Sequence, residues 1–242
     1  MNGCGLRYEV ELFDALRDIV YEDEYFFVIN KAAGLYTHRN HETHDVYAVA
    51  DVIADKVDFA YDDLKRGIVH RLDKDTSGLL ICAKREEVKT ALQSLFKKRK
   101  IKKIYWALVV GTMYEGTGEV ITGIDRDKKN RIKRRVVERG SGKKAHTRYR
   151  VLELYKEHTL VEVNILTGRM HQIRLHLNYL GHPVLGDKLY GRSHQKKMSE
   201  NKLFLLAKQL VFKHPFTNAE LDLAIDPPLF FEQKLAELTK NG

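Results

Sequence analysis

The stretch that most constrains the fold is residues 68–84, in which two apolar runs enclose a charged turn. The turn-forming residues Asp, Thr, Ser and Gly occupy positions 75–78. This pattern predicts a strand, a tight turn and a second strand. Because Arg71 and Asp73 are two positions apart, we expect them to point to the same side of an extended strand, with Leu72 facing the core.

A carboxylate and a guanidinium held side by side at a turn suit nucleophilic chemistry on an anionic substrate. The alternative interpretation is a surface hairpin with a solvated ion pair, since exposed pairs of this kind are common and weak. The stretch alone leaves both interpretations open, so other parts of the chain have to discriminate between them.

Composition indicates a folded chain that remains in a reducing environment. The 242 residues are 43% hydrophobic, which suffices for a core and excludes a disordered chain. No apolar run approaches the roughly 18 residues that span a bilayer, and the first residues lack the apolar segment of a signal peptide. Cys4 and Cys82 have no metal-type spacing. We therefore expect a cytoplasmic protein that is not bound to a membrane.

The net charge of +9 is unevenly distributed. Residues 126–150 contain twelve lysines or arginines against two acids, which gives +10 and leaves −1 for the rest of the chain. A second basic cluster occupies residues 97–103. Such clustering favours a polyanionic partner such as a nucleic acid. A solvated loop, or an arm for an anionic membrane surface, is the alternative.

Hydrophobic periodicity predicts a mixture of strands and helices without regular alternation. Strands are expected at 26–29, 68–84 (as a hairpin), 104–110, 119–124, 145–153, 159–166, 203–212 and 221–224, and helices at 45–59, 86–100, 167–180 and 230–240. The pattern indicates an α+β fold with a mixed, largely antiparallel central sheet and flanking helices. No linker or repeat divides the chain, so we expect a single domain over residues 1–242 with a core at about 18–230. The glycines at 140 and 142 indicate a mobile hairpin arm within the basic stretch.

The sequence His70-Arg71-Leu72-Asp73, followed by x-x-Thr-Ser-Gly, resembles the signature of the RluA-type pseudouridine synthases. The resemblance implies the fold of that family and makes Asp73 the catalytic residue. It also implies that Arg71 fills the gap left by an extruded nucleotide. A planar cation suits that role, because it stacks between bases and contacts phosphate.

Three further motifs carry the same resemblance, in family order, between about residues 18 and 230. They lie at 30–38, at 103–111, and at 167–176 with a continuation over 181–191. Two departures occur: Ala32 stands where the family usually has Pro, and Leu-Leu-Ala-Lys at 205–208 replaces a frequent Leu-His-Ala.

These motifs imply two more site residues. Tyr105 would stack on the target base, because its ring offers a flat apolar face with a polar tip; an ordinary strand aromatic is the alternative. Arg174 would reach Asp73, although 101 positions separate them. Arg174 follows Ile173 at the margin of the predicted helix's buried stripe, where a guanidinium needs a carboxylate partner.

The resemblance implies an isomerase that converts uridine in ribosomal or transfer RNA to pseudouridine. The glycosidic bond breaks, the uracil turns, and carbon 5 rejoins the sugar. This chemistry oxidises nothing and adds no group, so no cofactor and no metal are expected. His38, His41 and His44 recur at intervals of three. This spacing suits a metal, but a polar loop near RNA is the preferred interpretation because no Cys or acid cluster accompanies it.

We expect RNA to be the partner and the protein to be a monomer. We also expect no separate RNA-binding domain ahead of the core. The main alternative is a catalytically silent RNA-binding or ribosome-assembly protein on the same scaffold. A metal-dependent nuclease is a more distant alternative, and it would need a cluster of acids.

Overall fold

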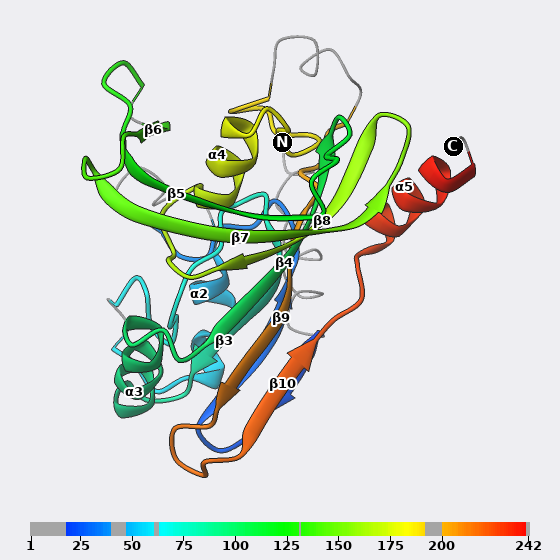
Figure 1. The fold of residues 1–242 in the computed structure, drawn as a ribbon. Helices are drawn as coiled ribbons and strands as arrows, with labels where there is room; N and C mark the ends of the chain where they lie inside the picture. Colours follow the sequence, from blue (N-terminus) through cyan, green and yellow to red (C-terminus); the bar gives the residue numbers. More distant parts are fainter. Residues whose placement is uncertain (1–17, 40–46, 61–62, 131, 192–199, 241–242) are drawn as a thin grey trace, which may run out of the picture. The chain divides into compact units, whose positions relative to one another are not determined.

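The computed structural model describes residues 18–39, 47–60, 63–130, 132–191 and 200–240. The chain divides into two compact units. The first comprises Met1–Ile101 and Leu210–Ile225, and the second comprises Lys102–Gln209 and Asp226–Gly242. Strands and helices are mixed within each unit, and most of the strand pairs run antiparallel (Figure 1). The predicted α+β class with a largely antiparallel sheet is confirmed.

The first unit is built on three neighbouring strands. Its elements are β1 (Ile19–Glu22), β2 (Phe26–Lys31), β3 (Ser77–Ala83), β10 (Glu220–Ala224), α2 (Val49–Val52), the 3-10 helix η1 (Ala54–Lys56) and α3 (Glu86–Lys97). Strand β2 pairs antiparallel with both β1 and β3. Every residue of β3 is buried, which explains why its residues 79–83 are an unbroken apolar run rather than an alternating one.

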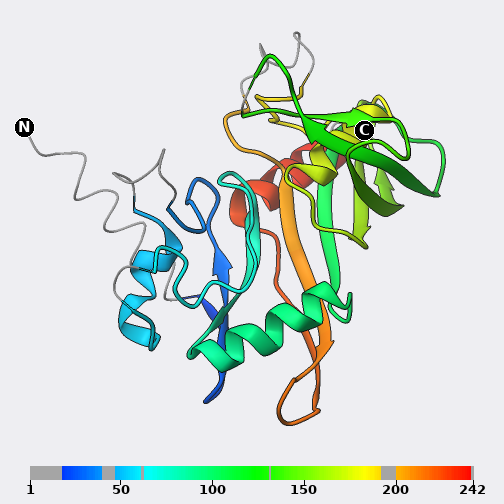
Figure 2. The same ribbon diagram turned by 90° about the vertical axis from the view of Figure 1, so that its left-hand side faces the viewer.

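Helix α3 packs its apolar stripe into the core of the first unit, as its periodicity predicts. Val88 and Leu92 are fully buried, and Leu95 and Phe96 pack against the same cluster. Figure 2 shows the helix along its length. It ends at Lys97, three residues earlier than predicted. The cause is the left-handed backbone two residues later, at φ = 58°, which stops the helical hydrogen-bond pattern.

Two predictions in the first unit are wrong in part. The weakly helical stretch 45–59 forms a four-residue helix and a three-residue 3-10 turn, with residues 45 and 46 outside the described part of the chain. The first arm of the 68–84 hairpin is reduced to an isolated bridge between Ile68 and Cys82. The other arm is β3, as predicted. Strands β2 and β3 pair antiparallel, with Lys31 opposite Gly78 at one end and Phe26 opposite Ala83 at the other.

The second unit contains a run of antiparallel neighbours in the order β4-β8-β7-β5-β6. Its elements are β4 (Lys102–Val110), β5 (Thr117–Arg126), β6 (Arg134–Val137), β7 (Lys143–Leu154), β8 (His158–Ile165), α4 (Gln172–Tyr179) and α5 (Leu229–Lys240). Strand β9 (Leu205–Lys213) begins in this unit and ends in the first. The expected strands at 104–110, 119–124, 145–153 and 159–166 are all present.

The basic stretch forms a hairpin, but the glycines at 140 and 142 lie after β6, between β6 and β7, and not in the turn between β5 and β6. Strands β5 and β6 pair from Gly123 opposite Val137 to Arg126 opposite Arg134. Strand β6 has no counterpart among the predicted strands, because its sequence Arg-Arg-Val-Val does not alternate. We call residues 126–144 the basic hairpin. Its mobility stays a prediction.

Candidate active site

The segment that carries Asp73 is held by a threonine from a distant part of the first unit. The hydroxyl of Thr37 donates to the carbonyl of Leu72 at 2.8 Å and accepts the N–H of Leu72 at 3.2 Å. Both side chains are buried. One hydroxyl thus satisfies the two backbone groups that a strand partner would otherwise have bound, which explains why this arm need not be a strand.

Asp73 follows this anchor directly and is half-buried, and its carbonyl accepts the N–H of Thr76 at 3.1 Å. Arg71 is exposed. Residues 71–73 are not part of a strand, so the expectation that the two side chains share one strand face stays a prediction. A half-buried carboxylate suits a nucleophile, since the protein positions it and it stays accessible to a substrate.

A buried lysine supports the turn that follows Asp73. The ammonium of Lys31 donates to the carbonyls of Ala32, Leu35 and Lys74 at 2.8, 3.0 and 3.0 Å. Its side chain is wholly inaccessible to solvent. Since Lys74 is the residue after Asp73, this lysine fastens the turn to the end of β2. The sequence motif at 30–38 contains Lys31 but suggests no role for it.

Burial lowers the pKa of Lys31 from 10.5 to about 7, although the negative charges of Asp73 and Asp75 act in the opposite direction. Between these two pH values the unfolded chain keeps a proton that the folded protein has released. The unfolded state then binds more protons, so the stability of the folded protein rises with pH over this interval. Lys31 therefore makes its largest unfavourable contribution to the stability of the folded protein below pH 7.

Comparison with a Lys31→Met variant isolates this effect. We expect the free energy of unfolding of the unmodified protein to increase relative to that of the variant as the pH rises from 7 towards 10. Urea denaturation of both proteins at several pH values measures the difference, and all other titrating groups cancel in it. A difference that is constant, or that falls with pH, would contradict a lysine with a lowered pKa.

His70 ties the same segment to two other elements. Its Nε2 accepts the N–H of Ile81 in β3 at 3.0 Å. Its ring packs on that of Phe96 in α3, with centroids 4.6 Å apart. The residues just before Asp73 are therefore fixed to both a buried strand and a helix of the first unit.

In the second unit, Tyr105 and Arg174 occupy different elements. Tyr105 lies on β4 opposite Val163 of β8, and 8% of it is exposed. Arg174 lies on α4 and is buried. Its Nε and Nη2 donate to the two carboxylate oxygens of Asp187, each at 2.7 Å. Its guanidinium also lies over the ring of Tyr190, 5.2 Å from the centroid.

The carboxylate of Asp187 is completely buried and strongly hydrogen-bonded. It accepts the N–H groups of Leu189 and Tyr190 at 2.9 Å in addition to the bonds from Arg174. Burial alone would raise its pKa, but these bonds outweigh burial, and the pKa lies below its usual range. The guanidinium therefore has a partner whose charged form is favoured and that fixes its position.

Helix α4 differs from its prediction at its beginning and in its buried surface. It starts at Gln172 rather than at 167–168, after His171 with a left-handed backbone at φ = 58°. Every residue from Gln172 to Leu177 is buried, so Arg174 is not at the margin of an apolar stripe. The buried polar residues are compensated by hydrogen bonds. His176, for example, lies between the hydroxyls of Thr122 and Thr147 at 2.9 and 2.8 Å.

Asp187 is the partner of the predicted site residue Arg174, and sequence reasoning did not single it out. It is the sole acidic residue between positions 167 and 191, a stretch that includes a buried arginine. That scarcity is the signal that could have identified it. The predicted pairing of Arg174 with Asp73 stays a prediction, since Asp73 and Arg71 belong to the first unit and Tyr105 and Arg174 to the second.

Other kinds of site have little support in the described ranges. Within them, no group of three or more His, Cys, Asp or Glu residues could hold a metal ion. His41 and His44 lie outside these ranges. No helix among the described residues is long and apolar enough to cross a membrane.

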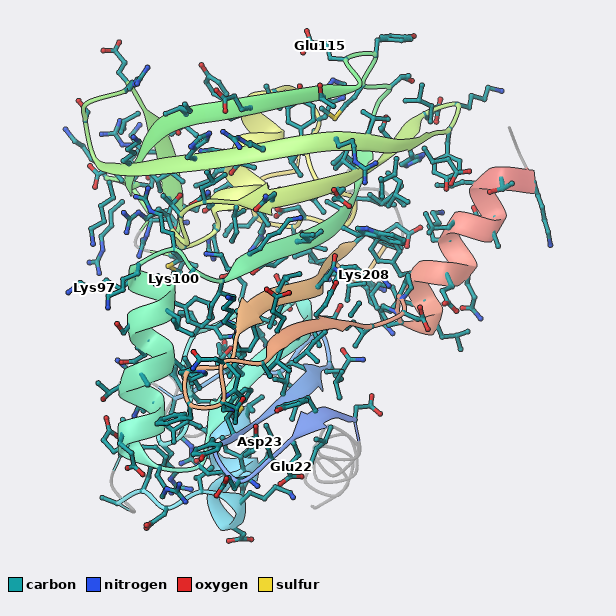
Figure 3. All side chains as sticks on the ribbon, turned by 60° about the horizontal axis from the view of Figure 1, so that its bottom comes forward. Glu22, Asp23, Lys97, Lys100, Glu115 and Lys208 are labelled. Carbon is teal, nitrogen blue, oxygen red and sulfur yellow. The ribbon has the colours of Figure 1, made fainter. Side chains whose placement is uncertain are left out.

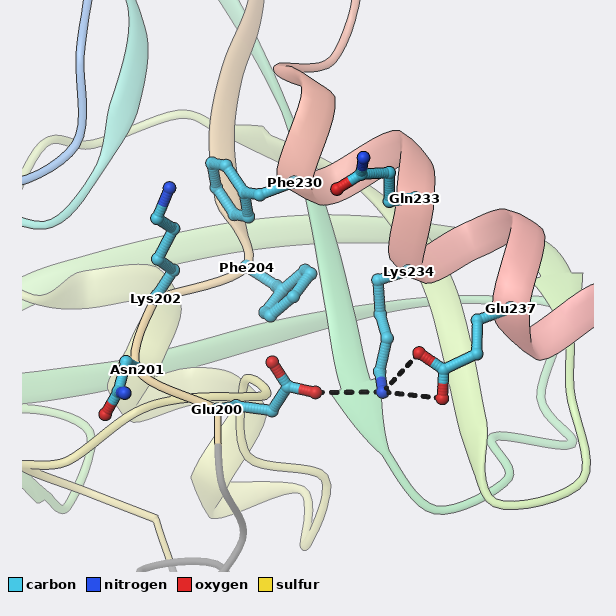
Figure 4. A pocket seen from close by; sticks show the side chains of 8 residues that line it. All are labelled: Glu200, Asn201, Lys202, Phe204, Phe230, Gln233, Lys234 and Glu237. Atoms are coloured by element: carbon cyan, nitrogen blue, oxygen red, sulfur yellow. Dashed lines mark hydrogen bonds and ion pairs between the residues drawn. The ribbon is translucent and has the colours of Figure 1, made fainter.

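A pocket of about 260 Å³ lies beside α5 in the second unit (Figure 4). Lys234 there bonds Glu200 at 2.8 Å and Glu237 at 3.1 Å. None of the four predicted site residues lines this pocket.

Comparison with known proteins gives a consistent result. A family model described as RNA pseudouridylate synthase matches residues 25–179. A ribosomal large subunit pseudouridine synthase D from Borreliella burgdorferi is 41% identical over 178 residues, which cover 72% of this chain and 54% of that protein. An uncharacterized RNA pseudouridine synthase from Synechocystis is 38% identical over 229 residues, which cover 93% of this chain and 69% of that one.

Among solved structures, the human protein RNA pseudouridylate synthase domain containing 4 is similar with a TM-score of 0.76 at 27% identity. The similarity covers 97% of both chains. The chain spans about half the length of the first curated relatives, 54% of the Borreliella protein and 52% of a synthase D from Xylella fastidiosa.

Proposed function

The chain belongs to the RNA pseudouridylate synthase family, and we propose that it isomerises uridine to pseudouridine in RNA. The observation that carries the proposal is the anchoring of the Asp73 segment. A half-buried carboxylate sits on a turn that a threonine hydroxyl and a buried ammonium hold from two sides. A protein that only bound RNA would need neither this carboxylate nor its supports.

In this proposal Asp73 is the nucleophile that opens the glycosidic bond. Arg71 fills the space that the target nucleotide leaves, Tyr105 stacks on the base, and Arg174 pairs with Asp73. The isomerisation conserves atoms: carbon 5 of uracil joins the sugar and releases its hydrogen to water, while the freed ring nitrogen gains a proton. The reaction needs no oxidant, cofactor or added group.

Large-subunit ribosomal RNA is the proposed substrate class. Several of the relatives carry the name ribosomal large subunit pseudouridine synthase D, which favours ribosomal over transfer RNA. We further propose that the protein acts as a cytoplasmic monomer. A target base within a helical stack must be turned out, at a cost of about a few kcal/mol, so contacts with phosphate have to compensate.

The basic hairpin suits such contacts. Its cations at Lys128, Lys129 and Arg139 are exposed, and none forms an ion pair with a residue of the described ranges. By contrast, Arg148 and Arg150 farther along β7 are paired with glutamates at 3.3 and 3.2 Å. Cations without internal partners are available to phosphate and release counterions when they bind it.

Reversal of these three charges tests the hairpin. In a Lys128→Glu/Lys129→Glu/Arg139→Glu variant, we expect the slope of log Kd for RNA against log salt to become shallower by about 2 or more. Fluorescence anisotropy at several salt concentrations measures the slope. A control with the same charge change carries glutamate at the exposed positions Lys156, Lys213 and Lys240. Equal slopes for variant and unmodified protein would place the RNA elsewhere.

Release of tritium from large-subunit ribosomal RNA labelled at carbon 5 of uridine tests the function. A synthase releases tritium into water, whereas a silent RNA-binding protein releases none. A metal-dependent nuclease shortens the RNA and stops when a chelator is added. We expect release that is unaffected by a chelator and leaves the RNA at full length. Binding of this RNA without release would contradict the proposed activity.

A further inference from the structure

We propose that the C-terminal end of α3 is a second RNA contact surface, which holds phosphates next to the target nucleotide. The surface, named here the α3-end patch, consists of Lys97, Lys98, Arg99 and Lys100. Figure 3 labels Lys97 and Lys100 at this end of the helix. The inference rests on the proposed function, to which it adds a defined contact separate from the basic hairpin.

All four side chains of the α3-end patch are exposed, and no ion pair joins any of them to a residue in the described part of the chain. The cations near the start of the same helix behave differently. Arg85 contacts Glu87 at 2.8 Å, and Lys89 contacts Asp63 at 3.1 Å and Glu86 at 3.6 Å. One end of α3 is thus internally neutralised, while the other presents four uncompensated charges.

The backbone that carries the patch is fixed. The N–H groups of Lys98, Arg99 and Lys100 donate to carbonyls of the last helical turn at 2.9, 3.1 and 2.9 Å. Ile101, which follows directly, is 3% exposed and belongs to the core of the first unit. The cations therefore project from an ordered turn, and binding a phosphate there costs little backbone entropy.

The helix dipole alone does not account for these residues. It favours cations near the last carbonyls of a helix, so it explains lysine at 97 and 98. It does not explain Arg99, whose φ of 58° is a left-handed conformation that favours glycine at this position after a helix. A guanidinium is present here in spite of an unfavourable backbone conformation. Such a cost is consistent with a functional requirement for the side chain.

A direct contact connects the patch to the catalytic segment. Phe96, the residue before Lys97, packs its ring on His70, with centroids 4.6 Å apart. His70 lies three positions before Asp73 and is fixed to β3 by its hydrogen bond with Ile81. The patch and the segment of the proposed nucleophile are therefore linked within the first unit through the contact between Phe96 and His70. A polyanion bound at the patch would be the same RNA whose uridine reaches Asp73.

A triple variant, Lys97→Gln/Lys98→Gln/Lys100→Gln, tests the inference. The matched control, Lys156→Gln/Lys213→Gln/Lys240→Gln, removes the same charge from three other exposed lysines. The probe is a uridine-containing stem–loop RNA taken from large-subunit ribosomal RNA. For the patch variant we expect the salt slope of log Kd to become shallower by about 2 and KM for tritium release to rise, with kcat unchanged. For the control we expect the values of the unmodified protein.

Arg99→Gly gives a second, independent readout. We expect the melting temperature to rise by about 2–4 °C, because glycine adopts the left-handed conformation without strain. The affinity for the same RNA should fall in spite of this stabilisation. A variant that is more stable but binds more weakly cannot be explained by loss of folding.

Three results would overturn the inference. The patch and control variants could lose affinity for RNA to the same extent. Arg99→Gly could bind RNA as tightly as the unmodified protein. The patch could be needed for binding to anionic phospholipid vesicles and not for binding to RNA. The proposed function fails separately, if the unmodified protein releases no tritium. In that case the salt slopes still report whether RNA contacts the α3-end patch.

Discussion

Replacement of Asp73 by asparagine is expected to abolish pseudouridine formation, with a loss of about a thousandfold or more in turnover. Asparagine preserves the size of the side chain but cannot act as a nucleophile. The segment around it should keep its structure, because Leu72 is held through backbone groups by Thr37 and the turn by Lys31. RNA affinity should therefore change little. Single-turnover tritium release and anisotropy on the same preparation measure both quantities.

Asp75→Asn is the matched control for this prediction. It removes the same charge two positions away, from an exposed side chain on the same turn. We expect near-normal turnover for this variant. If Asp73→Asn retained appreciable turnover, or if both variants lost it equally, the carboxylate of Asp73 would not be the nucleophile.

Replacement of Asp187 by alanine is expected to cause the largest loss of stability, about 3–5 kcal/mol. The change leaves the buried guanidinium of Arg174 without its carboxylate, and it also removes the acceptor of two backbone N–H groups. Urea denaturation followed by circular dichroism measures the effect. A loss below about 1 kcal/mol would show that the pair contributes little to the second unit.

A double variant separates the structural role of this pair from a role in turnover. Arg174→Ala alone should cripple turnover, but it also leaves a buried carboxylate without a partner. Arg174→Met combined with Asp187→Leu replaces both charges by apolar groups of similar size, an exchange that is often neutral for stability. We expect this double variant to fold but to have lost turnover. Normal turnover in the folded double variant would make the pair purely structural.

Patterns with one dominant cause were predictable from the sequence. The apolar stripe of α3 and the alternation in β7 and in the second half of β8 reflect burial of one face. All three elements appear where the pattern places them, apart from the earlier end of α3. Helix α4 deviates because its buried residues include Gln172, Arg174 and His176. Gln172 and His176 are compensated by hydrogen bonds with strands β5 and β7, and Arg174 by Asp187 in the loop after the helix. The periodicity of apolar residues does not reveal the hydrogen bonds that compensate for the burial of polar side chains.

The segment around Asp73 shows the same limit of sequence-based prediction. The motif around Asp73 identifies a candidate nucleophile, but its supports come from Thr37 and Lys31, 36 and 42 positions earlier. These contacts depend on the pairing of β2 with β3 and on the turn after β2, which only the folded chain brings together. For the same reason the partner of Arg174 in the second unit, Asp187, could not be derived from helical spacing.

The most direct test of the central claim is nucleoside analysis of the RNA product. Large-subunit ribosomal RNA lacking modifications is incubated with the unmodified protein, digested to nucleosides and separated by chromatography with mass detection. We expect a new nucleoside with the mass of uridine and the retention of pseudouridine, in fixed stoichiometry and without any cofactor. RNA that is bound by the protein but contains only uridine would contradict it.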